Sequence, residues 1–367
     1  MRDVRVEKLA DMLVNYSVAV KPGDKVAIEG STLAEPLLKE IYKSVLIAGG
    51  QPLVLPYFSS FKEIKYKFAS DEQLSFVYEH EKMLVETYDV FVHILAEENT
   101  KGLNDVDARK ISLAQHSRNE ATKIHLQRAA KKEMRWTLTL FPTNAYAQDA
   151  KMSLSNYEDF VYNACMPDMN NPVAYWEAVD KKQLRIVDWL DGKKQVHVTG
   201  LETDLCLSIE GRKFISCACH ENVPDGEIFT GPVENSIEGK VYFSYPAIFN
   251  GHEVTGIRLW FDKGKVIKAS AEKNEDFLLK MLDTDDGSRG VGEFAIGTNK
   301  GITKFTGAIL FDEKIGGSFH IALGLGYPET GSLAESSIHW DMICDLREGG
   351  KIVVDDQVLY QNGDFVI

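Results

Sequence analysis

The apolar residues of this chain recur with different periods in its two halves, and this change limits the folds available to it. In the first half, apolar segments of strand length alternate with amphipathic helical segments. The second half consists mostly of short strand-like segments. We therefore expect an α/β N-terminal domain over residues 1–184 and a β-rich α+β C-terminal domain over residues 185–367.

The first half repeats a strand–helix–strand pattern. Strands are predicted at 25–30, 51–58, 88–99 and 135–142, and helices at 32–48, 71–87 and 107–132. Gly49 and Gly50 end the first of these helices, because glycine readily takes the left-handed conformation that follows a helix. Repeated βαβ units predict a mostly parallel sheet with helices on its faces.

The second half is predicted to form a mostly antiparallel sheet or barrel. Its strands are predicted at 184–190, 194–200, 203–211, 240–249, 253–261 and 265–271, with one helix at 274–282. The sequences DKGK at 262–265 and QNGD at 361–364 are typical of hairpin turns in which Gly264 and Gly363 take a positive φ. Hairpins join antiparallel strands, which is the basis for this prediction.

The charge of the chain argues against some classes of partner. It has 41 basic and 55 acidic residues, a formal net charge of -14. Nucleic acids and anionic membranes favour basic surfaces, so neither is expected as a partner, whereas an acidic protein suits a site that attracts cations. No apolar run approaches the ~18 residues of a membrane span. The five cysteines show no repeated spacing typical of a disulfide framework, so we expect a cytoplasmic protein.

Common nucleotide and nucleophile motifs are absent from the sequence. No G-x-G-x-x-G follows a predicted strand, no G-x-x-x-x-G-K-[ST] occurs, and no G-x-S-x-G marks a nucleophilic serine. Cys217, Cys219 and His220 lie close enough in the sequence to hold zinc. No further cysteine pair accompanies them, and the two cysteines alternate as strand residues do, so buried structural thiols are the favoured interpretation.

The segment SSIHWDMICD at 336–345 predicts a strand with one polar and one apolar face. His339 and Asp341 share a face and Trp340 points the other way, because side chains two apart on a strand lie on the same side. A solvated hairpin face would explain this pattern. A metal site would also explain it, provided that other ligands converge on the same place.

Other candidate ligands lie in short strands flanked by glycine. GEIFTGP, GEFAIGTN and GSFHIALGLGY contain Glu227, Glu293 and His320. Each of these residues has an ordinary structural explanation when taken alone, but with His339 and Asp341 they make an oxygen and nitrogen ligand set that suits Zn²⁺, Co²⁺ or Mn²⁺. Three carboxylates and two neutral imidazoles carry a formal charge of -3. One divalent ion leaves the set negative and two give it +1, which favours a two-metal site and hydrolysis.

Four blocks of the second half resemble the signature blocks of the aminopeptidase T family, the thermophilic-type metalloaminopeptidases. They are PDGEIFTGPVENSIEG at 224–239, GEFAIGTN at 292–299, FHIALGLGY at 319–327 and IHWDMI at 338–343. The segment 141–164, with the Trp176 that follows it, resembles the part that the family carries before its second domain. The resemblance covers essentially the whole chain.

The resemblance implies a set of functional residues. It makes Glu227, Glu293, His320, His339 and Asp341 the ligands of two divalent ions (Zn, Co, Mn or Mg) and puts Tyr327 beside them as a catalytic hydroxyl. Glu227 or Glu293 would help to accept the proton of the water that the ions activate. The segment between His320 and His339 is shorter than the family pattern, and this difference concerns the rim of the site.

The resemblance also implies partners and a substrate class. The family is dimeric, so a homodimer is expected, with the N-terminal domain taking part in dimerisation and in access to the active site. The substrates implied are peptides with a free N-terminus. The activity implied is that of a metalloaminopeptidase, which removes the N-terminal residue through a metal-bridged water.

Two other functions remain open at this point. A mononuclear Fe(II) ring-cleaving dioxygenase related to this family would keep a His and carboxylate set, although Glu227 and Glu293 together exceed what one metal needs. Oxygen uptake with an aromatic diol after anaerobic iron loading would favour that function. A non-catalytic, metal-stabilised binding protein is the second alternative, and metal-dependent peptide turnover would exclude it.

Overall fold

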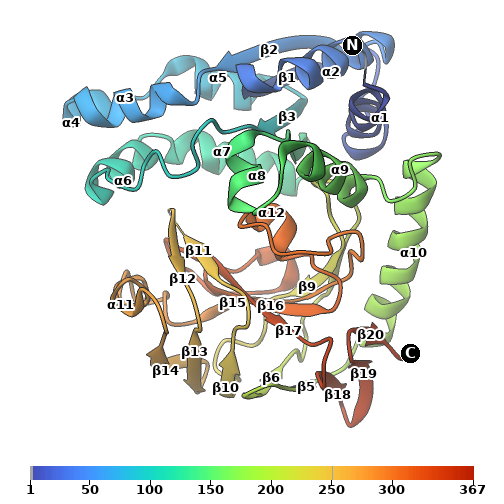
Figure 1. The fold of residues 1–367 in the computed structure, drawn as a ribbon, viewed down its shortest axis with the longest axis vertical. Helices are drawn as coiled ribbons and strands as arrows, with labels where there is room; N and C mark the ends of the chain where they lie inside the picture. The colour runs from blue at the N-terminus through green and yellow to red at the C-terminus, as the bar shows by residue number, and fades with distance from the viewer. Residues whose placement is uncertain (1–2, 250) are drawn as a thin grey trace. The chain divides into compact units, whose positions relative to one another are not determined.

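The computed structural model describes residues 3–249 and 251–367, which form two compact units (Figure 1). The first unit ends at Tyr175 and also contains Cys219–Pro224. The second unit contains Trp176–Ala218 and the chain from Asp225 onward. The predicted combination of an α/β part with a β-rich part is confirmed.

The first unit is built on a five-stranded parallel sheet in the order β2-β1-β3-β4-β8. The strands are β1 (Lys25–Ser31), β2 (Gln51–Tyr57), β3 (Val90–Leu95), β4 (Arg135–Leu140) and β8 (Asn222–Val223). The first four lie where apolar segments predicted them, and their parallel pairing confirms the inference from the βαβ repeats. The short β8 was not predicted, because two residues carry no periodic signal.

Helices lie on both faces of this sheet (Figure 1). α2 packs on β1 and β2, whereas α5 and α7 contribute Leu84 and Ala129 to a cluster with Ala27 and Phe91 of the sheet. The helices of the first unit, with the short helical turns η1 and η2, are α1 (Val4–Met12), η1 (Leu13–Ser17), η2 (Thr32–Ala34), α2 (Glu35–Ile47), α3 (Ser60–Phe68), α4 (Asp71–Leu74), α5 (Glu79–Thr87), α6 (Ala108–His116), α7 (Asn119–Ala130), α8 (Asn144–Asp149) and α9 (Leu154–Cys165).

Two of the predicted helices are interrupted. The helix predicted at 71–87 splits into α4 and α5, and the one predicted at 107–132 splits into α6 and α7. A serine stands at each break. The hydroxyl of Ser75 donates to the carbonyl of Asp71, and that of Ser117 donates to the carbonyl of Ala114. Such local bonds compete with the helical hydrogen bonds of the next turn, which explains why each helix ends there.

The prediction of a strand at 184–190 is wrong. These residues form the end of the helix α10 (Pro172–Leu190). The side chain of Asn171 caps its first turn by accepting from the backbone of Ala174, and Pro172 takes the first helical position, where its missing N–H is harmless. The buried residues Trp176, Gln183 and Leu190 recur every seven positions, a helical period that a seven-residue window is too short to reveal.

The second unit consists of antiparallel sheets. Eight strands follow the order β14-β13-β10-β6-β5-β18-β19-β20, five follow β17-β16-β15-β9-β7, and β11 pairs with β12. Their bounds are β5 (Gln195–Gly200), β6 (Thr203–Ser208), β7 (Ile215–Cys217), β9 (Glu227–Thr230), β10 (Glu238–Tyr242), β11 (Ala247–Phe249), β12 (His252–Val254), β13 (Arg258–Asp262), β14 (Lys265–Ser270), β15 (Val291–Gly297), β16 (Ser318–Gly324), β17 (His339–Asp345), β18 (Lys351–Val354), β19 (Gln357–Gln361) and β20 (Asp364–Phe365). The helices α11 (Glu275–Leu282) and α12 (Ile309–Asp312), the short turn η3 (Pro328–Thr330) and the part of α10 from Trp176 onward complete the unit.

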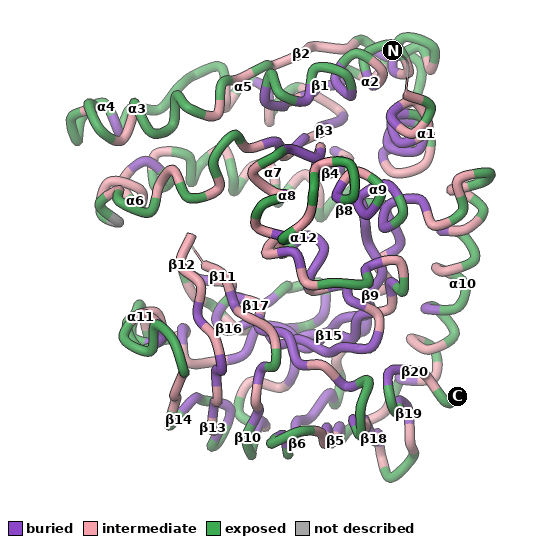
Figure 2. Tube along the Cα trace, viewed as in Figure 1, coloured by how far each residue is buried: buried purple, intermediate pink, exposed green. Residues whose placement is uncertain are grey.

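The core of the second unit contains buried residues of both large sheets. Figure 2 shows the buried stretches of these strands in purple. Val198 and Leu259 of the eight-stranded sheet belong to one cluster with Phe294, Ile321 and Trp340 of the five-stranded sheet. Because side chains alternate across a strand, the residues between these core positions point to the other face of the five-stranded sheet.

In the described part of the chain, no helix is long and apolar enough to cross a membrane.

The hairpin predicted at 262–265 is confirmed, since β13 and β14 pair through a turn in which Gly264 has a φ of 78°. A Cβ atom at this position would lie 1.6 Å from the carbonyl oxygen of Glu234, so a side chain cannot be accommodated without moving the backbone. Gly192 also has a positive φ, of 73°, but a Cβ atom there would meet no atom within 4 Å. A comparison of Gly264 with Gly192 therefore separates the cost of a positive φ from the cost of a clash with the carbonyl oxygen of Glu234.

We predict that Gly264→Ala lowers the free energy of unfolding by more than about 2 kcal/mol, whereas Gly192→Ala costs only about 1 kcal/mol for its left-handed backbone. Urea titration of both variants followed by circular dichroism would measure the difference. Equal losses in the two variants would show that the contact with Glu234 does not constrain the hairpin.

Candidate metal centre

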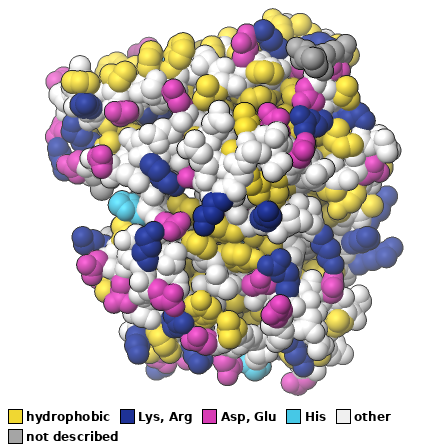
Figure 3. Space-filling view, viewed as in Figure 1, with side chains coloured by type: hydrophobic (Ala, Val, Ile, Leu, Met, Phe, Trp, Pro, Cys, Tyr) yellow, Lys and Arg dark blue, Asp and Glu magenta, His cyan; other side chains and the backbone are white. Residues whose placement is uncertain are grey.

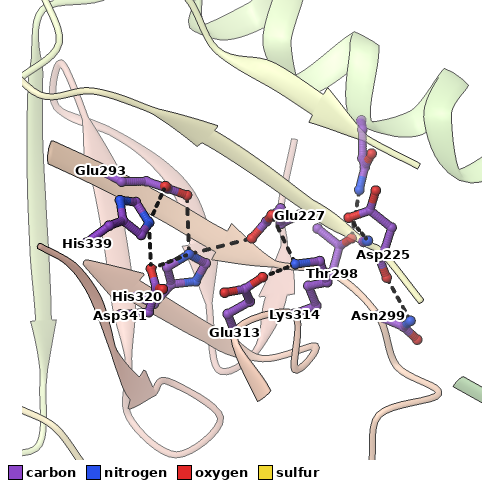
Figure 4. A network of polar contacts seen from close by, with 12 residues as sticks. Asp225, Glu227, Glu293, Thr298, Asn299, Glu313, Lys314, His320, His339 and Asp341 are labelled. Atoms are coloured by element: carbon purple, nitrogen blue, oxygen red, sulfur yellow. Dashed lines mark hydrogen bonds and ion pairs between the residues drawn. The ribbon is translucent and has the colours of Figure 1, made fainter. Parts of the chain in front are cut away.

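The five-stranded sheet gathers the five predicted ligands on the face that points away from the core (Figure 4). They come from four adjacent strands and together are called the metal centre here: Glu227 of β9, Glu293 of β15, His320 of β16, and His339 and Asp341 of β17. Their apolar neighbours on the strands, such as Phe294 and Trp340, are almost fully buried in the core. The alternation predicted for His339, Trp340 and Asp341 is therefore confirmed.

His320 lies among three carboxylates. Its Nε2 atom is 3.4 Å from Oε1 of Glu293, 3.5 Å from Oε2 of Glu227 and 4.0 Å from Oδ1 of Asp341. The imidazole is 1% exposed. In all three pairs the nitrogen that faces the carboxylate is Nε2.

His339 lies at the other end of the same group. Its Nε2 is 3.5 Å from Oε2 of Glu293 and 3.4 Å from Oδ1 of Asp341, while Nδ1 is 2.9 Å from the carbonyl oxygen of Leu325. In the neutral imidazole, donation from Nδ1–H to that carbonyl would leave the lone pair on Nε2, which is the arrangement of a metal-binding histidine. Glu293 thus directs one oxygen to each histidine.

Burial and charge shift the pKa values of this group. Burial raises the pKa of Glu227 to about 8. Burial works against protonated His320 and His339, but the surrounding carboxylates outweigh it and raise their pKa values to about 9 and about 10. Burial likewise opposes ionised Asp341, yet the neighbouring imidazole of His339 lowers its pKa to about 2. The group concentrates negative charge that needs a positive partner.

The donor set and its unsatisfied atoms fit divalent metal ions. Oε2 of Glu227 and Nδ1 of His320 are buried and have no hydrogen-bond partner among the described residues. Three of the four sets of ligand atoms that lie within 4.8 Å of one another contain a histidine of the centre: Glu227 with Glu293 and His320, Glu293 with His339 and Asp341, and Glu313 with His320 and Asp341. Carboxylate oxygens and imidazole nitrogens at this spacing are suited to zinc, cobalt or manganese.

Two charged residues of the centre were missed from the sequence. Glu313 and Lys314 follow α12 and lie beside the predicted ligands (Figure 4). Nζ of Lys314 is completely buried, 3.4 Å from Oε1 of Glu227 and in contact with Oε1 of Glu313. The run DEK at 312–314 looks like an ordinary solvated charge cluster, so periodicity gave no signal for these two residues.

Lys314 is held in its charged form. Burial alone would lower the pKa of its ammonium group, but the carboxylates of Glu227, Glu313 and Asp225 raise it well above the usual range. Burial raises the pKa of Glu313. Lys314 is therefore a fixed internal cation on the side of the centre that Glu227 occupies, and His339 lies on the other side.

The alternative zinc site is not formed by the described residues. No group of three ligand atoms combines Cys217, Cys219 and His220. Cys217 is only partly buried and its thiol lies instead near carboxylates of Asp225 and Glu227, whereas Cys219 is buried. None of the five cysteines, all of which the structure describes, forms a disulfide bond.

Tyr327 lies at the edge of the centre. Its ring meets that of His339 edge-on, with centroids 5.3 Å apart, and that of Phe229 at 5.4 Å. Desolvation and the charges of Glu293 and Asp341 raise the pKa of its hydroxyl, so the phenol stays protonated and can donate a hydrogen bond. The residue is 41% exposed, which leaves it open to a bound molecule.

Comparison with known proteins gives matches over nearly the whole chain. The family model described as thermophilic metalloprotease (M29) matches residues 2–365. Aminopeptidase 2 of Geobacillus stearothermophilus is 27% identical over 352 residues, which cover 88% of this chain and 84% of that protein. Aminopeptidase T of Thermus thermophilus is 29% identical over 248 residues, which cover 62% of this chain and 61% of that protein.

Two solved structures share the fold. Wild-type AmpT from Thermus thermophilus superposes with a TM-score of 0.88 at 23% identity and covers 99% of both chains. The 2,5-dihydroxypyridine dioxygenase from Pseudomonas putida KT2440 superposes with a TM-score of 0.58 at 13% identity and covers 98% of this chain and 96% of that one. At these identities the likeness concerns the fold alone.

We predict that Lys314→Met lowers the free energy of unfolding of the metal-free protein by about 3–5 kcal/mol, because it leaves the buried Glu227 and Glu313 without their cation. Lys300→Met is the matched control. Lys300 pairs with Asp364 on the surface, with 69% of its side chain exposed, and its loss should cost ~1 kcal/mol or less. Denaturant titration after chelation of metal measures both values, and a small loss for Lys314→Met would mean that its charge is not needed in the centre.

Proposed function

Because the chain belongs to the M29 family of thermophilic metalloproteases and is a metalloaminopeptidase, we propose that its metal centre holds two divalent ions and removes the N-terminal residue from peptides. The observation that carries this proposal is the position of Glu293, whose two oxygens face the two histidines separately. One ion would be held by Glu227, Glu293 and His320, and the other by Glu293, His339 and Asp341. A carboxylate oxygen of Glu313 also lies within 4.8 Å of ligand atoms of His320 and Asp341, so Glu313 would complete the ligand set.

Each residue of the proposed centre then has a role. When bound, two divalent ions polarise the scissile carbonyl and lower the pKa of a water molecule toward neutrality. Glu227 or Glu293 would take the proton of that water, and both have oxygens within 4.8 Å of the proposed ligand atoms of His320. The protonated hydroxyl of Tyr327 is placed at the edge of the centre, where it would donate a hydrogen bond to the developing oxyanion.

The number of carboxylates favours this proposal over a one-metal dioxygenase. A single Fe(II) site of the common type uses two histidines and one carboxylate. Here the two histidines are accompanied by Glu227, Glu293, Asp341 and Glu313. Four carboxylates exceed the requirement of one ion, and the likeness to the dioxygenase structure rests on 13% identity.

We also propose that the working unit is a homodimer. The helix α3 buries none of its residues within the chain. Phe61, Ile64 and Phe68 are 61%, 53% and 74% exposed, and their spacing puts them on one side of the helix. Figure 3 shows hydrophobic side chains at the surface along the upper edge of that view, over the first unit. A second copy of the chain that covers this side of α3 would remove its apolar side chains from water. Exposed apolar patches commonly mark such association surfaces.

The first prediction from this proposal concerns metal stoichiometry. Glu293→Gln removes the charge shared by both proposed ion positions and should reduce bound metal from two ions to less than one per chain, while His339→Ala should remove chiefly one of the two. Elemental analysis after dialysis against a metal buffer measures both. Controls are Glu253→Gln and His197→Ala, which lie in exposed pairs with Lys273 and Asp204. Unchanged stoichiometry in Glu293→Gln would contradict the shared position.

The second prediction concerns the end of the substrate that is recognised. A free α-amino group has a pKa of roughly 7.7 to 8.0, so near neutral pH it can bind a metal as the free base or a carboxylate as the cation. Acetylation removes both options. A leucyl peptide should be shortened one residue at a time from its N-terminus, and its N-acetyl form should react about 10⁴-fold more slowly. Mass spectrometry at matched metal tests this, and internal cuts or equal rates would refute the assignment.

The third prediction concerns assembly. Light scattering should report a dimer at micromolar concentration, and Phe68→Asp should weaken the dimer because it places a charge in the apolar side of α3. Leu126→Asp on α7, where the native side chain is 61% exposed, is the matched control and should leave the dimer intact. A fully active monomer in the wild type would exclude the dimer as the working unit.

A further inference from the structure

A cavity of about 530 Å³ lies in the first unit, on the face of the parallel sheet that α5 and α7 cover only in part. Glu29 of β1, Tyr57 of β2 and His93 of β3 line it from the sheet. His125 of α7 and Arg118, which immediately precedes that helix, line it from the other side. None of these residues belongs to the metal centre, which lies in the second unit.

The cavity lies at a place where parallel sheets commonly bind ligands. From β1 the chain crosses to β2 on one side and then to β3 on the other, so the direction of winding reverses between β1 and β3. In open α/β sheets, ligands bind at the carboxyl ends of the strands beside such a reversal. Glu29 and His93 face each other in register across β1 and β3, in the carboxyl-terminal half of both strands.

The sheet side of the cavity carries a fixed negative charge. Oε2 of Glu29 is 3.2 Å from Nδ1 of His93. The hydrogen bond from His93, with smaller contributions from cations that include Arg118, lowers the pKa of Glu29, so the carboxylate stays ionised. Its other oxygen has no hydrogen-bond partner among the described residues and remains available for a ligand.

The helix side of the cavity offers donors for a negative group. Nε of Arg118 donates to Glu81 at 3.0 Å, and its two terminal nitrogens have no protein partner in the described part of the chain. Tyr57 adds a donor from the sheet side, because burial raises the pKa of its hydroxyl to about 12 and keeps it protonated at neutral pH. Burial lowers the pKa of His125 to about 4, so this imidazole adds no positive charge.

The combination of charges narrows the class of ligand. The carboxylate of Glu29 would repel a phosphate, and the sequence carries no phosphate-binding loop. The described groups of three possible metal ligands all lie in the second unit, so the cavity is not a preformed metal site. Two carboxylates line the cavity, and Glu81 already pairs with Nε of Arg118. The remaining oxygen of Glu29, the terminal nitrogens of Arg118 and apolar walls that include Leu55 and Leu84 match a small zwitterion with an apolar side chain.

We propose that this cavity binds a free α-amino acid, with its ammonium group on Glu29, its carboxylate on Arg118 and Tyr57, and its side chain against the apolar wall. The site goes beyond the proposed hydrolysis and does not depend on it. Amino acids are the products of an aminopeptidase, so occupancy of the cavity would report product concentration to the first unit. The binding claim itself rests only on the cavity.

Calorimetric titration of the metal-stripped full chain tests the proposal, with glycine, L-leucine, L-phenylalanine and L-lysine as probes. At least one probe should bind at one site per chain with a Kd of roughly 1 mM or tighter. For the tightest probe, the N-acetyl and the amide derivatives should each bind roughly tenfold more weakly or worse, because each loses one charge-assisted contact. Absence of binding by all four probes, or equal binding of the blocked derivatives, would overturn the proposal.

Variants locate the binding in the cavity. Glu29→Gln and Arg118→Met should each weaken binding roughly tenfold or more. The matched controls Glu86→Gln and Arg109→Met change charges on the same unit that do not line the cavity, and both should bind as the wild type does. Glu293→Gln should also retain binding, which separates this site from the metal centre. Wild-type affinity in both cavity variants would refute the location, even if an amino acid binds elsewhere.

Discussion

The second unit depends on the neutralisation of buried negative charge. Glu227, Glu293, Glu313 and Asp341 converge on one side of the five-stranded sheet, where the positive partners among the described residues are Lys314 and two histidines. Unpaired buried carboxylates cost several kcal/mol each. The opposite face of the same strands is packed into the core, so the strands cannot turn these groups out to solvent. We infer that the group needs cations for its stability, and in the proposed function the hydrolytic chemistry would come from the ions that this charge attracts.

The two units differ in how they present polar groups. In the second unit, alternation across antiparallel strands places the proposed ligands from β9, β15, β16 and β17 side by side, and buried neighbours such as Trp340 pack on the opposite face. In the first unit, Glu29 and His93 meet because parallel strands align their carboxyl ends. The cavity of the first unit, lined by sheet and helix residues with apolar walls, is of the kind that binds a small molecule.

Much of this arrangement could be predicted from the sequence. The period of two placed His339 and Asp341 opposite Trp340, and the glycine-flanked strands correctly singled out Glu227, Glu293 and His320 as residues that converge. The C-terminal end of α10, residues 184–190, was predicted as a strand because a segment of seven residues is too short to distinguish the helical period of 3.6 from the strand period of two. Glu313 and Lys314 were missed because tertiary packing alone buries them, and Ser75 and Ser117 end helices through bonds that a pattern does not record.

The most direct test of the two-ion centre is anomalous X-ray diffraction from crystals grown with zinc, measured on both sides of the zinc absorption edge. The account predicts two anomalous peaks per chain on either side of the Glu293 carboxylate, roughly 3.5–4 Å apart, one beside His320 and Glu227 and the other beside His339 and Asp341. A single peak at full zinc loading, or peaks away from these side chains, would contradict the account.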